Sequence, residues 1–193
     1  MMLTKRAFLT ATLVAASGVV RAQTYPAKPI RMIVPLAPGA TADIVARIFA
    51  EELGKALGQT VVVDNKTGAG GTIATAEAAR APADGYTVAL VSQGTMVFNI
   101  GLYKAPGYDS LKDLTTVAVT GGVSNVLIVH PDNPAKTVAD VLAQARAKPG
   151  ELTYSSGGVG TSHHMSGVLL EMRTGVKLQH VPYRATPAGI QAV

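Results

Sequence analysis

The stretch Ile30–Asp43, IRMIVPLAPGATAD, runs an apolar strand into a Pro-Gly turn and then into a helix start. At such a junction the first backbone N–H groups of the helix have no intrahelical partner, so the turn favours a bound carboxylate or phosphate. The same succession recurs over residues 61–72, 87–95 and 152–162. Each copy ends in small and hydroxyl residues and not in catalytic side chains, which indicates binding instead of chemistry.

Strands alternate with helices along the chain. Hydrophobic periodicity and turn residues predict strands over 30–35, 60–64, 86–91, 117–120, 125–129, 152–155 and 177–181. Helices are predicted over 43–57, 72–81, 137–147 and 162–174, with a further helix start near 187. This alternation predicts parallel sheets with right-handed crossovers, in which ligands bind at the carboxyl ends of the strands.

Local signals refine two of these helices. The first has apolar residues at helical spacing, which predicts that they form its buried face: Ile44, Val45, Ile48, Phe49, Leu53 and Leu57. In the helix 137–147, Thr137 stands at the N-cap and Asp140 at the third helical position. The irregular stretch 102–114 then separates two series of elements, so we expect one α/β lobe over 23–124 and a second over 125–193.

The first 22 residues have the pattern of a secretory signal peptide. Lys5 and Arg6 precede an apolar run over 7–20, and Val20 and Ala22 supply small residues ahead of Gln23. We expect cleavage after Ala22 and a periplasmic location. The stretch 4–9 resembles a twin-arginine motif with Lys5 in place of the first arginine, so the export route stays open between the general and the twin-arginine pathways.

Charge and composition narrow the function classes. Lys5, Arg6 and Arg21 lie in the signal segment without any acidic residue, so the formal charge falls from +5 to +2 on cleavage. A weakly charged mature chain with few aromatic residues argues against nucleic-acid binding. Without cysteine the chain has neither disulfides nor thiolate metal sites. Residues 187–193 begin a helix without a C-cap, which suggests a truncated polypeptide.

Two glycine-rich turns are candidate anion sites. Gly68–Thr72 follows a strand and opens a helix, as a dinucleotide-binding turn does, but its third glycine position is Ile73 and no P-loop lysine follows. An exported nucleotide-binding enzyme with a Rossmann-like lobe is therefore kept only as an alternative. The stretch 155–162, SSGGVGTS, gathers hydroxyls and N–H groups before a helix. Its structural alternative is a flexible loop with an ordinary N-cap.

The remaining polar residues give no sign of catalysis. His163 and His164 are adjacent and point about 100° apart on a helix, so they cannot share a metal ion. His164 either holds the Ser/Thr loop or packs within its lobe, and His180 is interpreted as structural. Asp43 either orients the first turn or interacts with the helix N-terminus, the second being preferred. No nucleophile elbow or zinc motif occurs, so neither an enzyme nor a cofactor or metal is expected.

Several segments resemble, in order, the extracytoplasmic solute receptors of tripartite tricarboxylate transporters, the Bug-type binding proteins. The segments are Tyr25–Arg31 (YPAKPIR), 34–39 (VPLAPG), 68–71 (GAGG), 84–87 (DGYT), 149–154 (PGELTY) and 180–184 (HVPYR). Ala40 stands where this family usually has a second glycine, a position that would strain alanine if its φ were positive. Together the segments cover most of the chain after the signal segment.

The resemblance implies a two-lobed α/β fold of the Venus-flytrap type, with the second lobe incomplete in this chain. Such a receptor closes on a small organic carboxylate and delivers it to a membrane permease, and we expect a monomer. A truncated fragment that binds nothing is the other alternative. The ligand-binding residues that the resemblance and the four junctions imply are Gly39, Ala40, Thr41, Gly70, Gly71, Thr72, Ser92, Gly94, Thr95, Gly157, Gly160, Thr161, Ser162 and His164.

Overall fold

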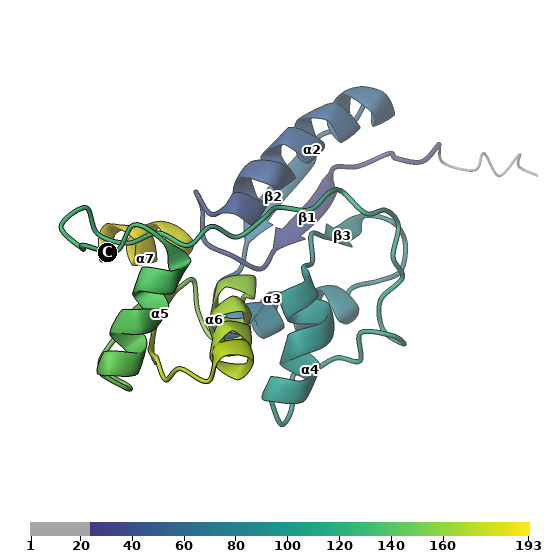
Figure 1. Cartoon of the computed structure of the whole chain (residues 1–193). Helices are drawn as coiled ribbons and strands as arrows, with labels where there is room; N and C mark the ends of the chain where they lie inside the picture. Colours follow the sequence, from purple (N-terminus) through teal and green to yellow (C-terminus); the bar gives the residue numbers. More distant parts are fainter. Residues whose placement is uncertain (1–23) are drawn as a thin grey trace, which may run out of the picture.

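The computed structural model describes residues 24–193, and their regular structure gathers in two groups, each built on its own sheet (Figure 1). The predicted signal peptide over residues 1–22 lies outside the described residues. No helix within residues 24–193 is both long enough and apolar enough to cross a membrane.

Three parallel strands form the first sheet, in the order β2-β1-β3. The central strand β1 (Ile30–Val34) lies between β2 (Val61–Asn65) and β3 (Thr87–Ala89). Because all three run in the same direction, their carboxyl ends meet at one edge, as the alternating pattern predicts. The junctions that follow these strands are therefore brought to the same side of the first lobe.

Helices cover both faces of this sheet (Figure 1). On one face α2 (Thr41–Leu57) packs Ala46 and Ala50 against Met32 and Val34 of β1. Gly58 ends this helix in the left-handed conformation (φ 64°), as expected of a glycine C-cap. The predicted buried face is partly wrong, since small residues make the contact and Ile44, Ile48 and Phe49 are exposed.

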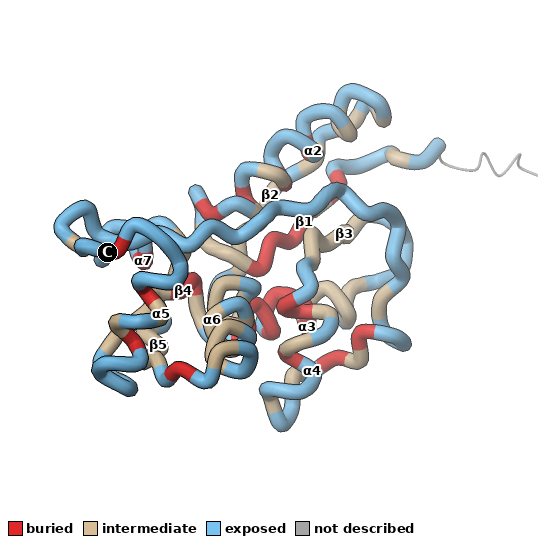
Figure 2. The backbone as a smooth tube through the Cα atoms, in the orientation of Figure 1, coloured by how far each residue is buried: buried red, intermediate tan, exposed pale blue. Residues whose placement is uncertain are grey.

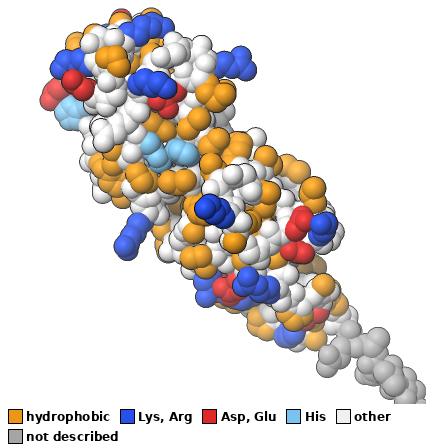
Figure 3. Space-filling view, turned by 90° about the horizontal axis from the view of Figure 1, so that it is seen from below, with side chains coloured by type: hydrophobic (Ala, Val, Ile, Leu, Met, Phe, Trp, Pro, Cys, Tyr) orange, Lys and Arg blue, Asp and Glu red, His pale blue; other side chains and the backbone are white. Residues whose placement is uncertain are grey.

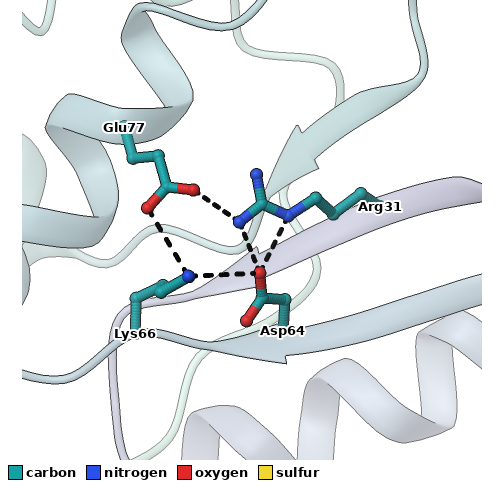
Figure 4. A network of polar contacts seen from close by, with 4 residues as sticks. All are labelled: Arg31, Asp64, Lys66 and Glu77. Carbon is teal, nitrogen blue, oxygen red and sulfur yellow. Dashed lines mark hydrogen bonds and ion pairs between the residues drawn. The ribbon is translucent and has the colours of Figure 1, made fainter.

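A four-residue charge network ties the other face of the sheet to α3 (Thr72–Ala79) (Figure 4). Arg31 of β1 donates through Nε to Asp64 of β2 at 2.8 Å and also pairs with Glu77 of α3. Lys66 lies 3.7 Å from Asp64 and 3.9 Å from Glu77. The Arg31 hydrogen bonds lower the pKa of Asp64, so the cluster is charged at neutral pH and joins three elements.

The second sheet pairs β4 (Thr153–Ser156) with β5 (Gln179–Pro182), again in parallel. Its crossover is α6 (Ser162–Thr174), with α5 (Val138–Ala147) and α7 (Thr186–Gln191) beside it (Figure 1). The capping box predicted for α5 is present, with Thr137 and Asp140 bonding reciprocally. A side chain at Gly167 would meet the Tyr154 ring, so this glycine lets α6 approach β4 closely.

The chain between the two groups is extended and exposed over most of its length (Figure 2). The predicted strands over 117–120 and 125–129 are wrong, because the structure has no strand there. Val117 and Val119 are nearly 90% exposed. Strand propensity of β-branched residues becomes a strand only when a neighbouring backbone supplies hydrogen bonds, and no described strand runs alongside this segment.

Candidate functional site

Asp43 stabilises the first junction through the hydrogen bonds of its buried carboxylate. Its carboxylate accepts the N–H of Gly39 at 2.9 Å, and Arg47 and Asn65 donate to it at 2.9 Å and 3.0 Å. The residue is 3% exposed. The hydrogen bond from Arg47 has the largest effect on the pKa of Asp43. Together the hydrogen bonds outweigh burial, which would raise this pKa, and lower it to about 2. Asp43 therefore orients the turn, which is the role that the sequence did not favour.

The backbone of this junction is unstrained and keeps free donors. Ala40 has φ −70° and ψ 158°, so alanine serves there as well as the family's usual glycine. Among residues 24–193, no hydrogen-bond partner is found for the N–H groups of Thr41 and Ala42. These two groups and the start of α2 form the first candidate anion-binding position.

The second junction is a run of left-handed residues. Residues 68–71 all have positive φ, including Ala69 at 45°, and only glycine adopts this conformation readily. Thr72 donates its hydroxyl to the Ala69 carbonyl at 2.9 Å, and Thr75 donates to the Gly71 carbonyl at 3.0 Å. The hydroxyl of Thr72, a predicted ligand group, is thus engaged in shaping its own turn.

The third junction runs from β3 into a π-helical turn (Gly94–Phe98) and the short helix α4 (Asn99–Leu102). The hydroxyl of Thr95 accepts the N–H of Ser92 and donates to its carbonyl, both at 3.1 Å. The hydroxyl of Tyr108 donates to the carbonyl of Thr95, and the residue Thr95 is only 2% exposed. Ser92 is exposed, and its own hydroxyl has no partner among the described residues.

The fourth junction, in the second lobe, is held by Thr161 and His164. Thr161 caps α6 by accepting the N–H of His164 and donates to the Gly158 carbonyl at 2.7 Å. Nδ1 of His164 accepts the N–H of Gly160 at 3.3 Å. His164 therefore holds the loop, as one of its two predicted roles requires, and Ser162 stays exposed at the helix start.

Beneath this loop lies a cluster of aromatic side chains that the sequence did not reveal. Ser156 Oγ and His180 Nε2 are 2.6 Å apart, and the His180 ring packs between those of Tyr154 and His164, at 4.9 Å and 4.3 Å between centroids. On the face in Figure 3, histidine side chains appear in the half of the molecule away from the grey residues. His180 thus supports the loop of the fourth junction through its contacts with Ser156 and His164.

The pKa directions in this cluster predict that the second lobe is less stable in acid. Burial lowers the pKa of His164 and His180, and His164 lowers that of His180 further. The unfolded chain, with a histidine pKa near 6.5, then binds more protons than the folded chain does, so stability falls as pH drops below about 6.5. We expect the urea midpoint to be lower at pH 5.5 than at pH 7.5. His180→Gln should reduce that difference, and an unchanged difference would exclude His180 as a source.

The junctions of the two lobes meet in a narrow seam. A Cβ on Gly70 would overlap with the carbonyl of Val159, and one on Gly94 would lie 2.6 Å from the carbonyl of Gly160. A Cβ on Gly160 would in turn overlap with the side chain of Asn99. Glycine at these three positions is what lets the two backbones touch.

The structure brings together predicted residues from the second, third and fourth junctions. The second junction also lies against Pro35, which follows β1, and against Thr95 of the third junction, because a Cβ on Gly71 would lie 2.9 Å from that of Pro35 and 2.8 Å from a methyl group of Thr95. Gly39 takes no part in these contacts, because nothing lies within 4 Å of the position that a Cβ on Gly39 would occupy. Two open hollows on the first lobe, one between α2 and β2 and one beside α3, contain none of the predicted ligand residues.

Asn99 is the residue of the seam that sequence reasoning missed. It is fully buried, donates through Nδ2 to the Gly70 carbonyl at 2.8 Å and faces Gly160. The available signal was an asparagine inside the apolar run 96–102, MVFNIGL, because a polar residue in such a run needs buried partners.

Two α/β groups with opposed strand–turn–helix junctions define the class of periplasmic binding proteins, and comparison with known proteins agrees. The profile of the family described as "Tripartite tricarboxylate transporter family receptor" matches residues 45–193. The chain belongs to this family. The predicted membership and the predicted two-lobed α/β architecture are both confirmed.

Individual relatives give the extent of the match. Protein BugT of Bordetella pertussis is 39% identical over 178 residues, which are 90% of this chain and 54% of that protein. A solved R. palustris protein with adipate is 36% identical with a TM-score of 0.83, over 86% of this chain and 56% of that one. MatC from Rhodopseudomonas palustris with bound malate is 30% identical with a TM-score of 0.81, over 87% and 57%. The chain spans about half the length of the curated relatives it matches.

Proposed function

We propose that the chain is a solute-binding receptor that captures a small organic carboxylate between its two lobes for a tripartite tricarboxylate-type transporter. The observation that carries this proposal is the meeting of strand–turn–helix junctions from both lobes at one seam. Relatives solved with adipate and malate support the carboxylate class.

The internal hydrogen bonds sort the predicted ligand residues by role. Thr72, Thr95 and Thr161 have their hydroxyls engaged within their own turns. The donors that remain are exposed or lie at helix starts: the Thr41 and Ala42 N–H groups, the Ser92 hydroxyl, and the first N–H groups of α6 at Ser162. None of the predicted ligand residues is Lys or Arg. Capture therefore relies on neutral donors and helix dipoles, with water completing the shell.

The geometry does not favour the nucleotide alternative. In a dinucleotide-binding turn the glycines let a pyrophosphate approach the backbone. Here the Val159 carbonyl of the second lobe occupies the space beside Gly70, and the Asn99 amide bonds the Gly70 carbonyl. The position that a phosphate would need is filled by protein.

The proposal includes the cellular location, the oligomeric state and the lobe boundaries of the receptor. A signal peptide cleaved after Ala22 would deliver the chain to the periplasm as a monomer, with lobes over 23–124 and 125–193. Closure would present a surface to the permease subunits. Solved relatives described as periplasmic support this location, and the family name supports the transport role without any catalytic step.

Thermal unfolding with added ligand tests the proposal. The purified protein is melted alone and with malate, adipate, citrate and NAD. A carboxylate at about 100 times its Kd should stabilise the protein by roughly 2.7 kcal/mol and raise the Tm. A cooperative melt that none of the carboxylates shifts would contradict the proposal, and a shift with NAD alone would favour the nucleotide alternative.

Ser92 and Thr95 of the third junction are expected to differ in role, with Ser92 contributing to ligand binding and Thr95 to stability. Ser92→Ala removes an exposed hydroxyl without an internal partner, so we expect about a tenfold loss of carboxylate affinity with unchanged stability. Thr95→Ala removes a buried hydroxyl with two internal bonds and should cost about 1–2 kcal/mol of unfolding free energy. Calorimetric titration and urea unfolding measure the two effects. Equal affinity in Ser92→Ala would remove Ser92 from the site.

A further inference from the structure

Asn99 is a buried polar side chain of the first lobe that faces the second lobe. Its Nδ2 group donates to the carbonyl of Gly70, in the turn before α3, and so joins the second junction to the third. Its Oδ1 atom is buried without a hydrogen-bond partner among the described residues and faces Gly160. The amide nitrogen of Asn99 thus bonds within the first lobe, while its oxygen faces the second lobe. The side chain is therefore in contact with both lobes at once.

The second-lobe segment Val159–Gly160 fits between three groups of the first lobe. Gly70 faces the Val159 carbonyl, Gly94 faces the Gly160 carbonyl, and Asn99 covers the Cα of Gly160. Leu102 adds an apolar contact, 3.6 Å from where a Gly160 Cβ would be. The segment thus has first-lobe groups on several sides, and Asn99 supplies the polar side chain that faces Gly160.

We propose that Asn99 is a positioning residue that latches the Val159–Gly160 segment to the first lobe and thereby holds the two halves of the ligand site together. This inference rests on the proposed function and adds the residue that sets the closed arrangement. The contact between Asn99 and Gly160 forms when the lobes close, so it favours the closed form. Because the ligand binds the closed form, the free energy of ligand binding becomes more favourable by the contribution of this contact.

The first test replaces Asn99 with alanine and compares Asn133→Ala, which removes an equivalent side chain with hydrogen bonds inside the second lobe. Because the chain has no cysteine, Lys55→Cys and Met172→Cys, both exposed and on opposite lobes, provide the only two labelling sites for a fluorescence distance measurement. We expect Asn99→Ala to lengthen the distance between labels and weaken malate or adipate binding about tenfold. Asn133→Ala should change neither.

The second test is a double-mutant cycle with Gly160→Ala. The added Cβ overlaps with Asn99, so Gly160→Ala should weaken binding about 100-fold in the wild type and only about tenfold in Asn99→Ala, where its space is vacant. The positive φ of Gly160 strains alanine equally in both backgrounds and cancels from the cycle. Equal factors in the two backgrounds would show that Asn99 and Gly160 do not contact each other in the ligand-bound form.

A third variant keeps the inference testable if Asn99→Ala fails to fold. Asn99→Ser keeps a small polar group in the buried space but no longer reaches Gly160, so it should also lengthen the label distance. Unchanged distances in Asn99→Ala and Asn99→Ser, or additive effects in the cycle, would overturn the latch. A wild type that binds neither probe would instead contradict the proposed function, while the distances without ligand would still test Asn99.

Discussion

Replacing Asp43 with alanine is expected to lower the free energy of unfolding by about 3 kcal/mol. The substitution leaves the Gly39 N–H and the Asn65 amide without their buried acceptor and loosens both the first turn and the end of β2. Hydrogen bonds to a charged acceptor contribute about 1.5–3 kcal/mol each, and a buried donor left unpaired costs a similar amount. Urea unfolding at pH 7 measures the change.

The matched control is Glu52→Ala, which removes an exposed carboxylate from the same helix. We expect it to leave the urea midpoint unchanged. Acid titration gives an independent check, because the pKa of Asp43 is about 2 when folded and near 3.8 when unfolded. Its contribution of about 2 kcal/mol is present above pH 4 and lost as pH falls toward 2. Asp43→Ala should lack that loss, and an identical acid limb in both proteins would contradict the assignment.

Gly71→Ala is expected to destabilise the protein by about 3 kcal/mol. Its φ of 92° is unfavourable for alanine, and the new Cβ would lie 2.8 Å from a methyl group of Thr95 and 2.9 Å from Cβ of Pro35. Left-handed strain costs about 1–2 kcal/mol, and overpacking of rigid neighbours costs about 1–3 kcal/mol. Thermal or urea unfolding shows the effect as an earlier transition.

Gly101→Ala is the corresponding control. This glycine of α4 has open space around its Cβ position and no positive φ, so alanine should be neutral or stabilising by up to about 1 kcal/mol. If both variants lowered stability equally, the effect would come from loss of glycine in general. The expected contrast places the cost in the positive φ of Gly71 together with its contacts with Pro35 and Thr95.

The sequence predicted the features that depend on near neighbours. Thr137 and Asp140 form a capping box within one turn of helix, and the helix predicted over 43–57 ends at Leu57 as expected. The four junctions were likewise identified, because each requires glycine and hydroxyl residues in one short stretch. For the same reason their internal hydrogen bonds, such as Thr161 to Gly158, follow from local spacing.

The features that sequence reasoning missed depend on residues far apart in the chain. Asn99 receives its role from Gly70 and Gly160, which no local pattern connects to it. The β-branched run over 125–129 has the composition of a strand but no neighbouring strand among the described residues. Ile44 and Ile48 have helical spacing, yet Ala46 and Ala50 allow the closer approach of α2 to β1 and occupy the core.

The seam between the lobes is built mainly from carbonyl groups and glycine Cα atoms, which has a consequence for how such a receptor changes over generations. In the proposed site, substitutions at exposed donors such as Ser92 and Ser162 would alter what is recognised without touching the surfaces that meet. Ligand preference and closure are therefore separable under mutation. New specificities can arise one side chain at a time, while Gly70, Gly94 and Gly160 admit almost no replacement.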